Sequence, residues 1–430
     1  MTAHHRTWQL GAAVVGIALL AAACSSSSKP SHPAAASAVA ATASTPTSAA
    51  QPNKGTFTVG LLTDLTGLGA SSSKTSVQGV EAGVATLAAQ AGYTIKFVTA
   101  DTTSAPAAAL TAAQKLVEQD HVFAVIAASG LLFAASNYLT SQGIPVVGVA
   151  VDGPEWITAR NMFSVFGPLD FTKVTTTQGE FFKMQGATTL GTLGYSISPS
   201  SSEAAEGAAL SAQNAGLKVG YVNSKFTFGG TDVQPVALAM KAAHVDAISP
   251  SVDPNTSFAL ITALRQAGVD LKVALLPTGY GGDLAQAGPG ALQAAQDVYF
   301  LSSWEPVEMD TPATRQFQAA LRGIGVTTDP TYGEYAGYTS VALLVRGLEA
   351  AGTDPTRPAL IGALSGITDF NAAGLYGSHA LDMGDRSTAA VGVDNCYWIT
   401  KLAGSTFQLV PGADPICGSV IPGKTVSASS

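Results

Sequence analysis

From residue 56 onward, short apolar runs alternate with Ala-rich amphipathic segments, and this alternation restricts the fold more than any other feature of the sequence. Most of the apolar runs are uninterrupted, as in parallel strands that helices cover on both faces. The alternation predicts an α/β fold of doubly wound parallel sheets, and the number of runs requires two sheets. Strands are expected at 56–62, 96–99, 123–127, 145–150, 187–194, 218–222, 247–249, 273–276 and 298–301.

The segments between these runs have the apolar period of helices. At 106–119, for example, Pro106 lies near the start, and Leu110, Leu116 and Val117 fall on one face. Helices are expected at 76–90, 106–119, 204–215, 233–243, 256–268, 312–322, 335–351 and 357–365. After Ser387, a pair of strands at 389–393 and 397–401 indicates that the chain crosses back to complete an earlier lobe, and residues beyond about Cys417 are expected to form a loose tail.

The N-terminal region has the pattern of an export signal. Arg6 precedes an apolar stretch at 10–23, which is too short for a membrane span and typical of the apolar core of a signal peptide. The stretch closes with Leu-Ala-Ala-Ala-Cys at 20–24, which resembles a bacterial lipobox, although Ala21 stands where Leu is usual. Lipidation of Cys24 and ordinary cleavage after the small residues 21–23 are the two alternatives, and both predict a protein that works outside the cytoplasm.

The charge balance of the sequence limits the kinds of partner that the protein is expected to bind. The net charge is −8, and removal of residues 1–23 takes away only Arg6 among the charged residues, which leaves −9. This mild acidity disfavours binding to nucleic acid or to an anionic membrane surface. Residues 24–54 are almost entirely Ser, Ala, Pro and Thr, which predicts a flexible tether. No later stretch reaches 18 apolar residues, so no transmembrane helix is expected.

Few other residues indicate a disulfide, a metal site or a nucleotide-binding site. With Cys24 assigned to lipid, Cys396 and Cys417 are left as a candidate disulfide pair, and two buried free thiols are the alternative. The histidines have no paired spacing with cysteine or carboxylate, so neither a metal site nor another cofactor is expected. Residues 418–425 match the P-loop pattern by letter, but only five residues follow, where the motif needs a helix.

Ligands of open parallel sheets bind outside the carboxyl ends of the strands, so the residues that follow each strand define a candidate site. These residues combine hydroxyls, carboxylates, small residues and rings, which suits a small polar ligand held between two lobes. The alternative is that Ser, Asp and Gly occur there only because they form turns. The candidate ligand-binding residues are Asp64, Thr66, Ser129, Gly130, Asp152, Gly153, Ser196, Asp253, Thr278, Tyr280 and Trp304.

Four segments carry a resemblance to a known family. Residues 57–88 (FTVGLLTDLTGLGASSSKTSVQGVEAGVATLA), 123–147 (FAVIAASGLLFAASNYLTSQGIPVV), 151–167 (VDGPEWITARNMFSVFG) and 252–269 (VDPNTSFALITALRQAGV) are similar, in order and spacing, to type I periplasmic solute-binding proteins of the leucine/isoleucine/valine-binding branch. The resemblance implies two lobes joined by three crossovers, which close on a solute and pass it to an ABC permease. It also implies a protein without enzymatic activity. Together with the lipobox-like segment, it predicts a protein anchored to the outer face of the cell membrane through Cys24.

The residue patterns and the resemblance together divide the chain as follows: a signal peptide at 1–23, a disordered tether at 24–54, a first lobe at 55–170 and 305–385, a second lobe at 171–304 and 386–412, and a C-terminal tail at 413–430. Hinges are expected at 168–171, 302–306 and 385–388. A sensor that reports to a membrane receptor without transport is an alternative function on the same fold. A hydrolase on an α/β scaffold is a second alternative, but the sequence has no Gly-x-Ser-x-Gly nucleophile motif.

The chain departs from the amino-acid binders of this branch at two places. Asp152 stands where a threonine is usual, and Gly279 falls near the position of the acid expected to hold the ligand ammonium. A negative charge where a carboxylate should dock disfavours a standard α-amino acid pose. We therefore expect a ligand that is neutral or carries an amine or amide facing Asp152, with Tyr280 or Trp304 stacked on it.

Overall fold

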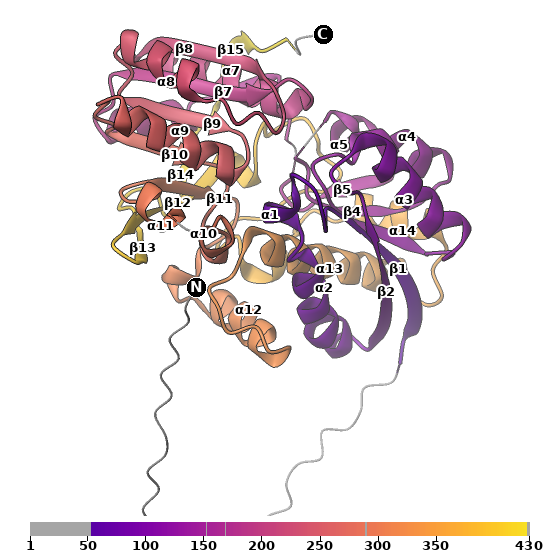
Figure 1. The fold of residues 1–430 in the computed structure, drawn as a ribbon. Coiled ribbons are helices and arrows are strands. Elements are labelled where there is room, and N and C mark those ends of the chain that lie inside the picture. Colours follow the sequence, from indigo (N-terminus) through magenta and orange to yellow (C-terminus); the bar gives the residue numbers. More distant parts are fainter. Residues whose placement is uncertain (1–52, 152, 168, 289, 428–430) are drawn as a thin grey trace, which may run out of the picture. The chain divides into compact units, whose positions relative to one another are not determined.

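A computed structural model describes residues 53–151, 153–167, 169–288 and 290–427, and they form two α/β lobes (Figure 1). The first lobe is built on a wholly parallel sheet, in the order β2 (Tyr93–Asp101), β1 (Gly55–Thr63), β3 (Ala124–Ala128), β4 (Val146–Gly148) and β5 (Met162–Ser164). Its other elements are α1 (Ala70–Ser73), α2 (Ser76–Gly83), η1 (Val84–Ala88), α3 (Pro106–Glu118), α4 (Phe133–Ser141), α5 (Glu155–Thr158), η2 (Val307–Met309), α12 (Pro312–Gly323), α13 (Tyr332–Ala351), α14 (Arg357–Ser365) and η3 (Ala372–Gly374).

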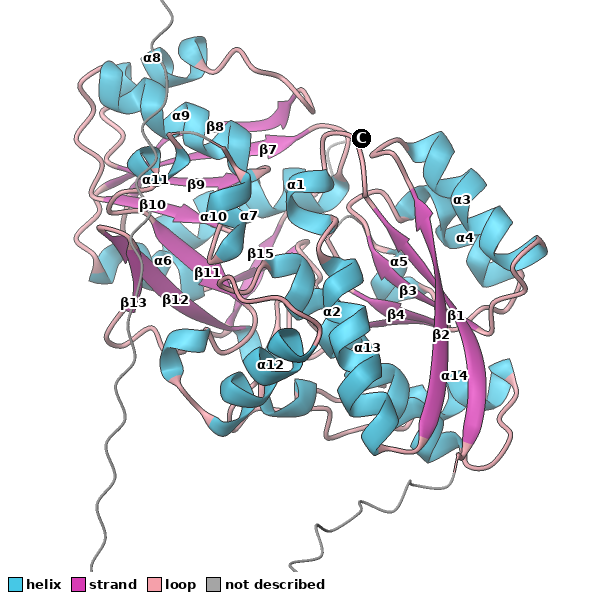
Figure 2. Ribbon diagram, turned by 60° about the horizontal axis from the view of Figure 1, so that its bottom comes forward, coloured by secondary structure: helices cyan, strands magenta, loops and turns pink. Residues whose placement is uncertain are grey.

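Helices cover both faces of this sheet. Figure 2 shows α3 and α4 on one side and α2 and α13 on the other. Val59 and Leu61 of β1 pack into the cluster that contains α13, whereas Leu62 packs into the cluster that contains α3. The strand is therefore buried on both faces, which explains why it reads as an uninterrupted apolar run.

The second lobe is built on a mixed sheet with the order β13 (Thr406–Leu409), β12 (Cys396–Ala403), β11 (Tyr299–Ser302), β10 (Val273–Leu276), β9 (Ala247–Ser251), β7 (Thr189–Tyr195) and β8 (Lys218–Phe226). The strands from β8 to β11 are parallel, and β12 and β13 add an antiparallel hairpin at the edge. The helices of this lobe are α6 (Thr177–Met184), α7 (Pro199–Asn214), α8 (Gln234–Ala242), α9 (Pro254–Gln266), α10 (Gly282–Gln286) and α11 (Ala291–Ala294). The predicted fold of two doubly wound lobes is confirmed.

The chain passes between the two sheets three times: after β5, after β11 and before β12. The first and third of these crossovers lie side by side. Leu169 and Val391 form an isolated antiparallel bridge, and the Asp170 amide donates to the carbonyl of Ala390 at 2.7 Å. Crossovers of this kind are where two-lobed binding proteins hinge, and the hinges expected at 168–171, 302–306 and 385–388 stay predictions.

The prediction of a strand at 389–393 is wrong. Val391 makes only the single bridge to Leu169, and a 3-10 turn, η4 (Val393–Asn395), follows. Gly392, with a φ of 60°, and the left-handed Asp394 turn the chain before β12 begins. Residues in that conformation end an extended segment, so the apolar residues at 389–393 do not form a strand.

The C-terminal region is more ordered than the sequence indicates. In place of a loose tail beyond Cys417, β15 (Val420–Thr425) pairs antiparallel with β6 (Lys173–Thr175). Ile421 and Val426 are buried against Val174, and Cys417 of β14 (Ile416–Cys417) is joined by a disulfide to Cys396 of β12. The disulfide closes a loop of 21 residues, for which the chain-entropy relation gives about 3 kcal/mol of stabilisation.

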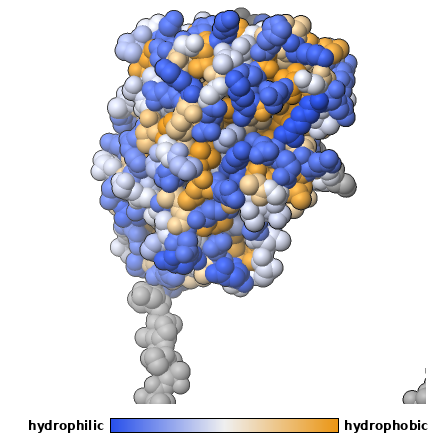
Figure 3. All heavy atoms as spheres, turned by 90° about the vertical axis from the view of Figure 1, so that its left-hand side faces the viewer, coloured by the Kyte–Doolittle hydropathy of each residue, from blue (hydrophilic) through white to orange (hydrophobic). Residues whose placement is uncertain are grey.

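Charged residues make up only 12% of the sequence. On the face shown in Figure 3, apolar residues are interspersed among polar ones. Within the described ranges, no helix combines the length and the apolar character needed to cross a membrane.

Candidate functional site

A cavity of about 280 Å³ opens between the lobes, and both lobes contribute to its lining. The lining residues follow the carboxyl ends of β1, β3, β4 and β5 in the first lobe and of β7, β9, β10 and β11 in the second. The position agrees with the general rule for open parallel sheets. The cavity volume is close to the range usual for small-molecule sites, about 300–1,000 Å³.

On the first-lobe side, the carboxylate of Asp64, which follows β1, is held by residues that follow the two neighbouring strands, β2 and β3. The hydroxyl of Ser129 donates to Asp64 Oδ1 at 2.6 Å, the hydroxyl of Thr102 donates to the same oxygen, and the Gly130 amide donates to Oδ2 at 3.3 Å. Asp64 is only 2% exposed, and burial raises the pKa of its carboxyl despite these donors, which act in the opposite direction. The carboxyl is thus fixed at the cavity wall.

On the second-lobe side, Asp253 caps α9 and lines the cavity. Its Oδ1 accepts from the amides of Asn255 and Thr256 at 2.9 and 3.1 Å, and its Oδ2 accepts from the hydroxyls of Thr256 and Tyr195. Burial, followed by the charge of Asp253, raises the pKa of the Tyr195 hydroxyl, so this hydroxyl remains a donor at neutral pH. Tyr195 is therefore held as a fixed part of the cavity wall.

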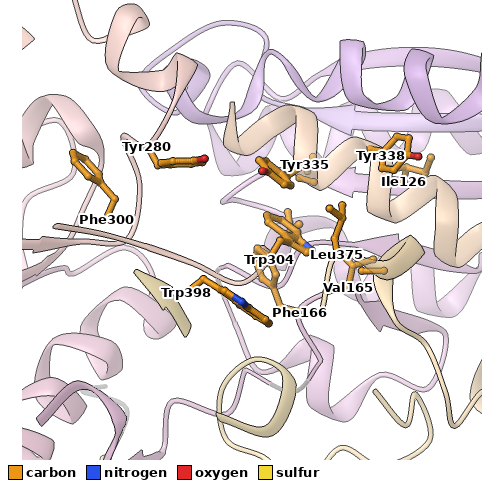
Figure 4. Packing of buried hydrophobic residues seen from close by; sticks show 14 of the residues in the cluster. Ile126, Val165, Phe166, Tyr280, Phe300, Trp304, Tyr335, Tyr338, Leu375 and Trp398 are labelled. Carbon is orange, nitrogen blue, oxygen red and sulfur yellow. The ribbon is translucent and has the colours of Figure 1, made fainter. Parts of the chain in front are cut away.

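An aromatic cluster lines the cavity where the second crossover leaves β11. Trp304 stacks on Tyr335 with centroids 5.4 Å apart and an interplanar angle of 10°, and it lies 4.8 Å from the ring of Phe166. Figure 4 shows Trp304 between Phe166 and Tyr335, with Tyr280 beyond Tyr335. Such a wall of rings suits the apolar body of a ligand.

A third carboxyl, Asp283 of α10, links the lobes at this end of the cavity. Its Oδ2 accepts from the Tyr332 amide at 3.2 Å, and Tyr332 begins α13 of the first lobe. Complete burial raises the pKa of Asp283 well above its usual range, and the nearby Glu334 adds to the effect. Tyr280 makes a similar link, because its hydroxyl bonds Glu308 and accepts from the Val307 amide at 3.1 Å.

Six of the eleven predicted ligand-binding residues line the cavity: Asp64, Gly130, Asp253, Thr278, Tyr280 and Trp304. Ser129 lies behind Asp64 and reaches the cavity only through it. Asp152 lies outside the described residues, as does Cys24, so their proposed roles stay predictions.

The other three residues lie away from the lining. Thr66 is exposed, and its hydroxyl donates to Asp101 at 2.7 Å, which fixes the loop after β1. Gly153 packs against the Glu155 side chain, and the Ser196 amide continues the pairing with Phe226. Turn formation, the alternative reading of such residues, accounts for these positions.

Several lining residues were not predicted. They are Phe166, Phe228, Asp283, Tyr332 and Tyr335. Phe166 follows β5 by two residues, so the strand-end rule could have found it, but Tyr332 and Tyr335 lie at the start of a helix. Serines at the end of α1 and at the start of α7 also line the cavity: Ser72, Ser73, Ser198, Ser200 and Ser201.

The described residues bring together one group with metal-ligand atoms, His379 with Cys396 and Cys417. Both cysteines are joined to each other, so their sulfurs are not available as thiolate ligands.

Because of Glu203 of α7, which lies near the first crossover, we expect the stability of the protein to depend on pH. Burial raises the pKa of this carboxyl to about 7 from an ordinary 4.5, and the charges of Asp170 and Glu206 contribute. A raised acid pKa means that the folded protein binds the proton more tightly than the unfolded chain, so stability falls as pH rises from about 4.5 to about 7. We expect Glu203→Gln to be more stable than the parent at pH 8 by roughly 1–2 kcal/mol, after allowance for solvent screening, and to show no such gain at pH 4.5.

Urea denaturation at both pH values measures the effect of Glu203→Gln. Glu81→Gln on the exposed face of α2 is the control, and it should change stability equally at the two pH values. A gain for Glu203→Gln that is the same at pH 4.5 and pH 8 would contradict the assignment.

The sequence matches a family described as periplasmic binding protein over residues 56–406, which is most of the chain. No curated protein matches the sequence significantly.

Many solved structures share the fold. An ABC-transporter solute-binding protein from R. palustris in complex with 4-hydroxybenzoate superposes with a TM-score of 0.69 at 19% identity, covering 83% of this chain and 96% of that chain. The leucine-binding protein LivK from Thermotoga maritima gives 0.68 at 16% identity, with 83% and 97% covered. The branched-chain amino acid binding protein LivJ from Streptococcus pneumoniae, in complex with isoleucine, gives 0.66 at 19% identity, with 85% and 99% covered.

Proposed function

Because the chain belongs to the periplasmic binding protein family, whose members bind solutes without catalysing a reaction, we propose that it is the extracytoplasmic solute-binding lipoprotein of an ABC importer. The observation that carries the proposal is the cavity between the lobes, to which both sheets contribute through their carboxyl ends. A ligand held there touches both lobes at once, so its binding energy favours the closed arrangement.

The closed protein then presents a surface that the permease recognises, and the ligand is released into the transport path. In this proposal the lipid on Cys24 holds the protein at the outer face of the membrane, and residues 24–54 allow it to reach the permease. The similar proteins from R. palustris and Streptococcus pneumoniae hold 4-hydroxybenzoate and isoleucine. We propose a solute of similar size for this chain: an amino acid, an amide or a related amine.

A thermal melting screen of residues 25–430 tests the proposal. The panel comprises amino acids, amides, amines, aromatic acids, nucleosides and sugars. A ligand present at 100 times its dissociation constant adds about 2.7 kcal/mol to the free energy of unfolding, which is a readily measured shift. A shift from a small organic solute supports the proposal, and small-angle scattering of the same sample should show a smaller radius of gyration.

Transport itself needs a second measurement. Uptake of the labelled solute into cells should fall when the gene is deleted, and Cys24→Ser should release the protein from the membrane fraction. Binding and closure without any change in uptake would instead favour a sensor of the same fold.

A further inference from the structure

One part of the cavity wall has the chemistry of an anion site, yet the chain fills it with its own carboxylate. A hydroxyl and a backbone amide converge after β3, on Ser129 and Gly130, and such groups commonly hold carboxylates. Here Ser129 donates to Asp64 at 2.6 Å and Gly130 donates to the other oxygen of the same carboxylate at 3.3 Å. A ligand carboxylate would have to displace Asp64 to reach these donors.

Displacement of Asp64 is opposed on every side. The Thr102 hydroxyl also donates to Asp64, and the place where a Cβ on Gly69 would stand is only 2.7 Å from Asp64 Oδ2, so the loop after β1 closes over it. Three donors and the loop thus fix the side chain in this position.

The rest of the described lining offers a carboxylate hydroxyl donors but no positively charged partner. Besides Asp64, the described residues that line the cavity include the carboxyls of Asp253 and Asp283, and they include no lysine, arginine or histidine. Carboxyl oxygens accept hydrogen bonds and attract positive charge, so they suit N–H donors of a ligand. Thr278 adds a buried hydroxyl that no other described group contacts by hydrogen bonding, and it can serve as donor or acceptor.

The remaining lining fits an apolar body. Phe166 and the stacked pair Trp304 and Tyr335 form one wall, and Tyr195 and Phe228 meet edge to face, 5.1 Å apart, on the second-lobe side. A dry apolar cavity of about 150 Å³ suffices to bind benzene. The present volume of about 280 Å³ therefore has room for one ring and a short polar chain.

We propose that the cavity selects solutes without a free carboxylate, and that its ligand carries an amine or amide on an aromatic or branched apolar body. The selection rests on the proposed function, and it narrows the solute class by excluding free amino acids and aromatic acids. Asp64 is the residue that determines this selection, because it occupies the donors that a ligand carboxylate needs.

Matched compounds on the unmodified chain give the first test. Each of two series keeps one apolar group and varies the polar group. The aromatic series comprises phenethylamine, 3-phenylpropionamide, phenylalanine and 3-phenylpropionate. The branched series comprises isoamylamine, 4-methylpentanamide, leucine and 4-methylpentanoate. Isothermal titration calorimetry of residues 25–430 should show the amine or the amide binding at least a hundredfold more tightly than the acids of the same series.

The variant Asp64→Ala gives the second test, because it frees Ser129 and Gly130. Its affinity for 3-phenylpropionate or 4-methylpentanoate should rise at least tenfold, and its affinity for the matched amine should fall. Asp310→Ala is the control: it removes the same charge from an exposed turn away from the cavity and should change neither affinity. If Asp64→Ala does not fold, Asp64→Ser serves the same purpose with a smaller loss of hydrogen bonding.

The outcomes separate this inference from the proposed function. An acid that binds the unmodified chain as tightly as its amine and amide overturns the inference and leaves the solute-binding function intact. Failure of every compound in both series and in the wider thermal screen would sink the proposed function and the inference with it. Equal acid affinities in the parent and in folded Asp64→Ala would show that Asp64 is not the selecting residue.

Discussion

Replacing Gly337 by alanine is expected to destabilise the protein by about 3 kcal/mol, a large effect for one methyl group. Gly337 lies in α13, where this helix crosses α2. A Cβ at this position would stand 2.4 Å from the Ser76 carbonyl oxygen and 2.6 Å from the Val80 amide nitrogen, both on the backbone of α2. Backbone atoms cannot turn away as a side chain can, so the two helices would have to separate.

The crossing has little room to adjust. Gly79 of α2 faces α13 in the same way, with its Cβ position 2.2 Å from the Glu334 carbonyl oxygen. Separation of α2 and α13 would open contacts on the core-facing side of the first sheet, where Val80 and Val341 are fully buried. The loss therefore combines steric strain with reduced packing.

Gly362→Ala is the matched control for this prediction. Gly362 lies inside α14, and no heavy atom lies within 4 Å of the position that its Cβ would take. Alanine is favoured over glycine in a helix by about 1 kcal/mol, so this variant should be more stable than the parent. Urea denaturation of both variants should thus give changes of opposite sign, and similar changes would show that α2 and α13 are not tightly packed.

Gly337 also illustrates how far the sequence predicts the fold. The helix expected at 335–351 is present as α13, Tyr332–Ala351, because its apolar period is strong. The expected start is three residues late, since Thr331 and Glu334 form a capping box that lies before the apolar pattern begins. The same kind of error occurs at α7 and α9, whose caps, Ser198 and Asp253, precede a Pro at the first helical position.

The elements that the sequence missed depend on tertiary contacts. The helix α6 has only eight residues and is held by the burial of Phe181 and Phe182, and β15 exists because β6 offers it an edge. Neither has a local pattern of its own. The strand expected at 389–393 failed for the opposite reason, because its apolar letters are followed by a left-handed turn that only the folded structure imposes.

The candidate site was predicted by location more than by residue. Strand ends identified Asp64, Asp253 and Trp304, because parallel strands bring their carboxyl ends to one edge. The same rule could not show that Asp64 turns toward Ser129 or that Tyr335 reaches the cavity from α13. Side-chain direction and the approach of the second lobe decide these contacts, and neither is encoded in strand order.

Trp304→Ala is expected to lower the free energy of unfolding by about 3–5 kcal/mol and to weaken ligand binding on the order of a hundredfold. Trp304 is 2% exposed, and it packs between the rings of Phe166 and Tyr335 while also lining the cavity (Figure 4). Its removal therefore leaves a void in the aromatic cluster and takes away a wall on which the apolar body of the solute rests.

Trp398→Ala separates the two effects. Trp398 of β12 is 1% exposed, but it is absent from the described lining of the cavity. Its loss should cost a similar free energy of unfolding and leave ligand affinity within about threefold of the parent, because it removes core packing and no ligand contact. The measurements are urea denaturation and calorimetric titration of the solute that gives the largest shift in the thermal screen.

The conservative pair Trp304→Phe and Trp398→Phe keeps the comparison available if either alanine variant does not fold. Phenylalanine retains most of the buried apolar area and shortens the ring system, so both proteins should fold. Trp304→Phe should still weaken binding by about tenfold, whereas Trp398→Phe should not change it. Equal affinities for the two variants would mean that the ligand does not rest on Trp304, and that the aromatic cluster serves to join the second crossover to α13 without contacting the solute.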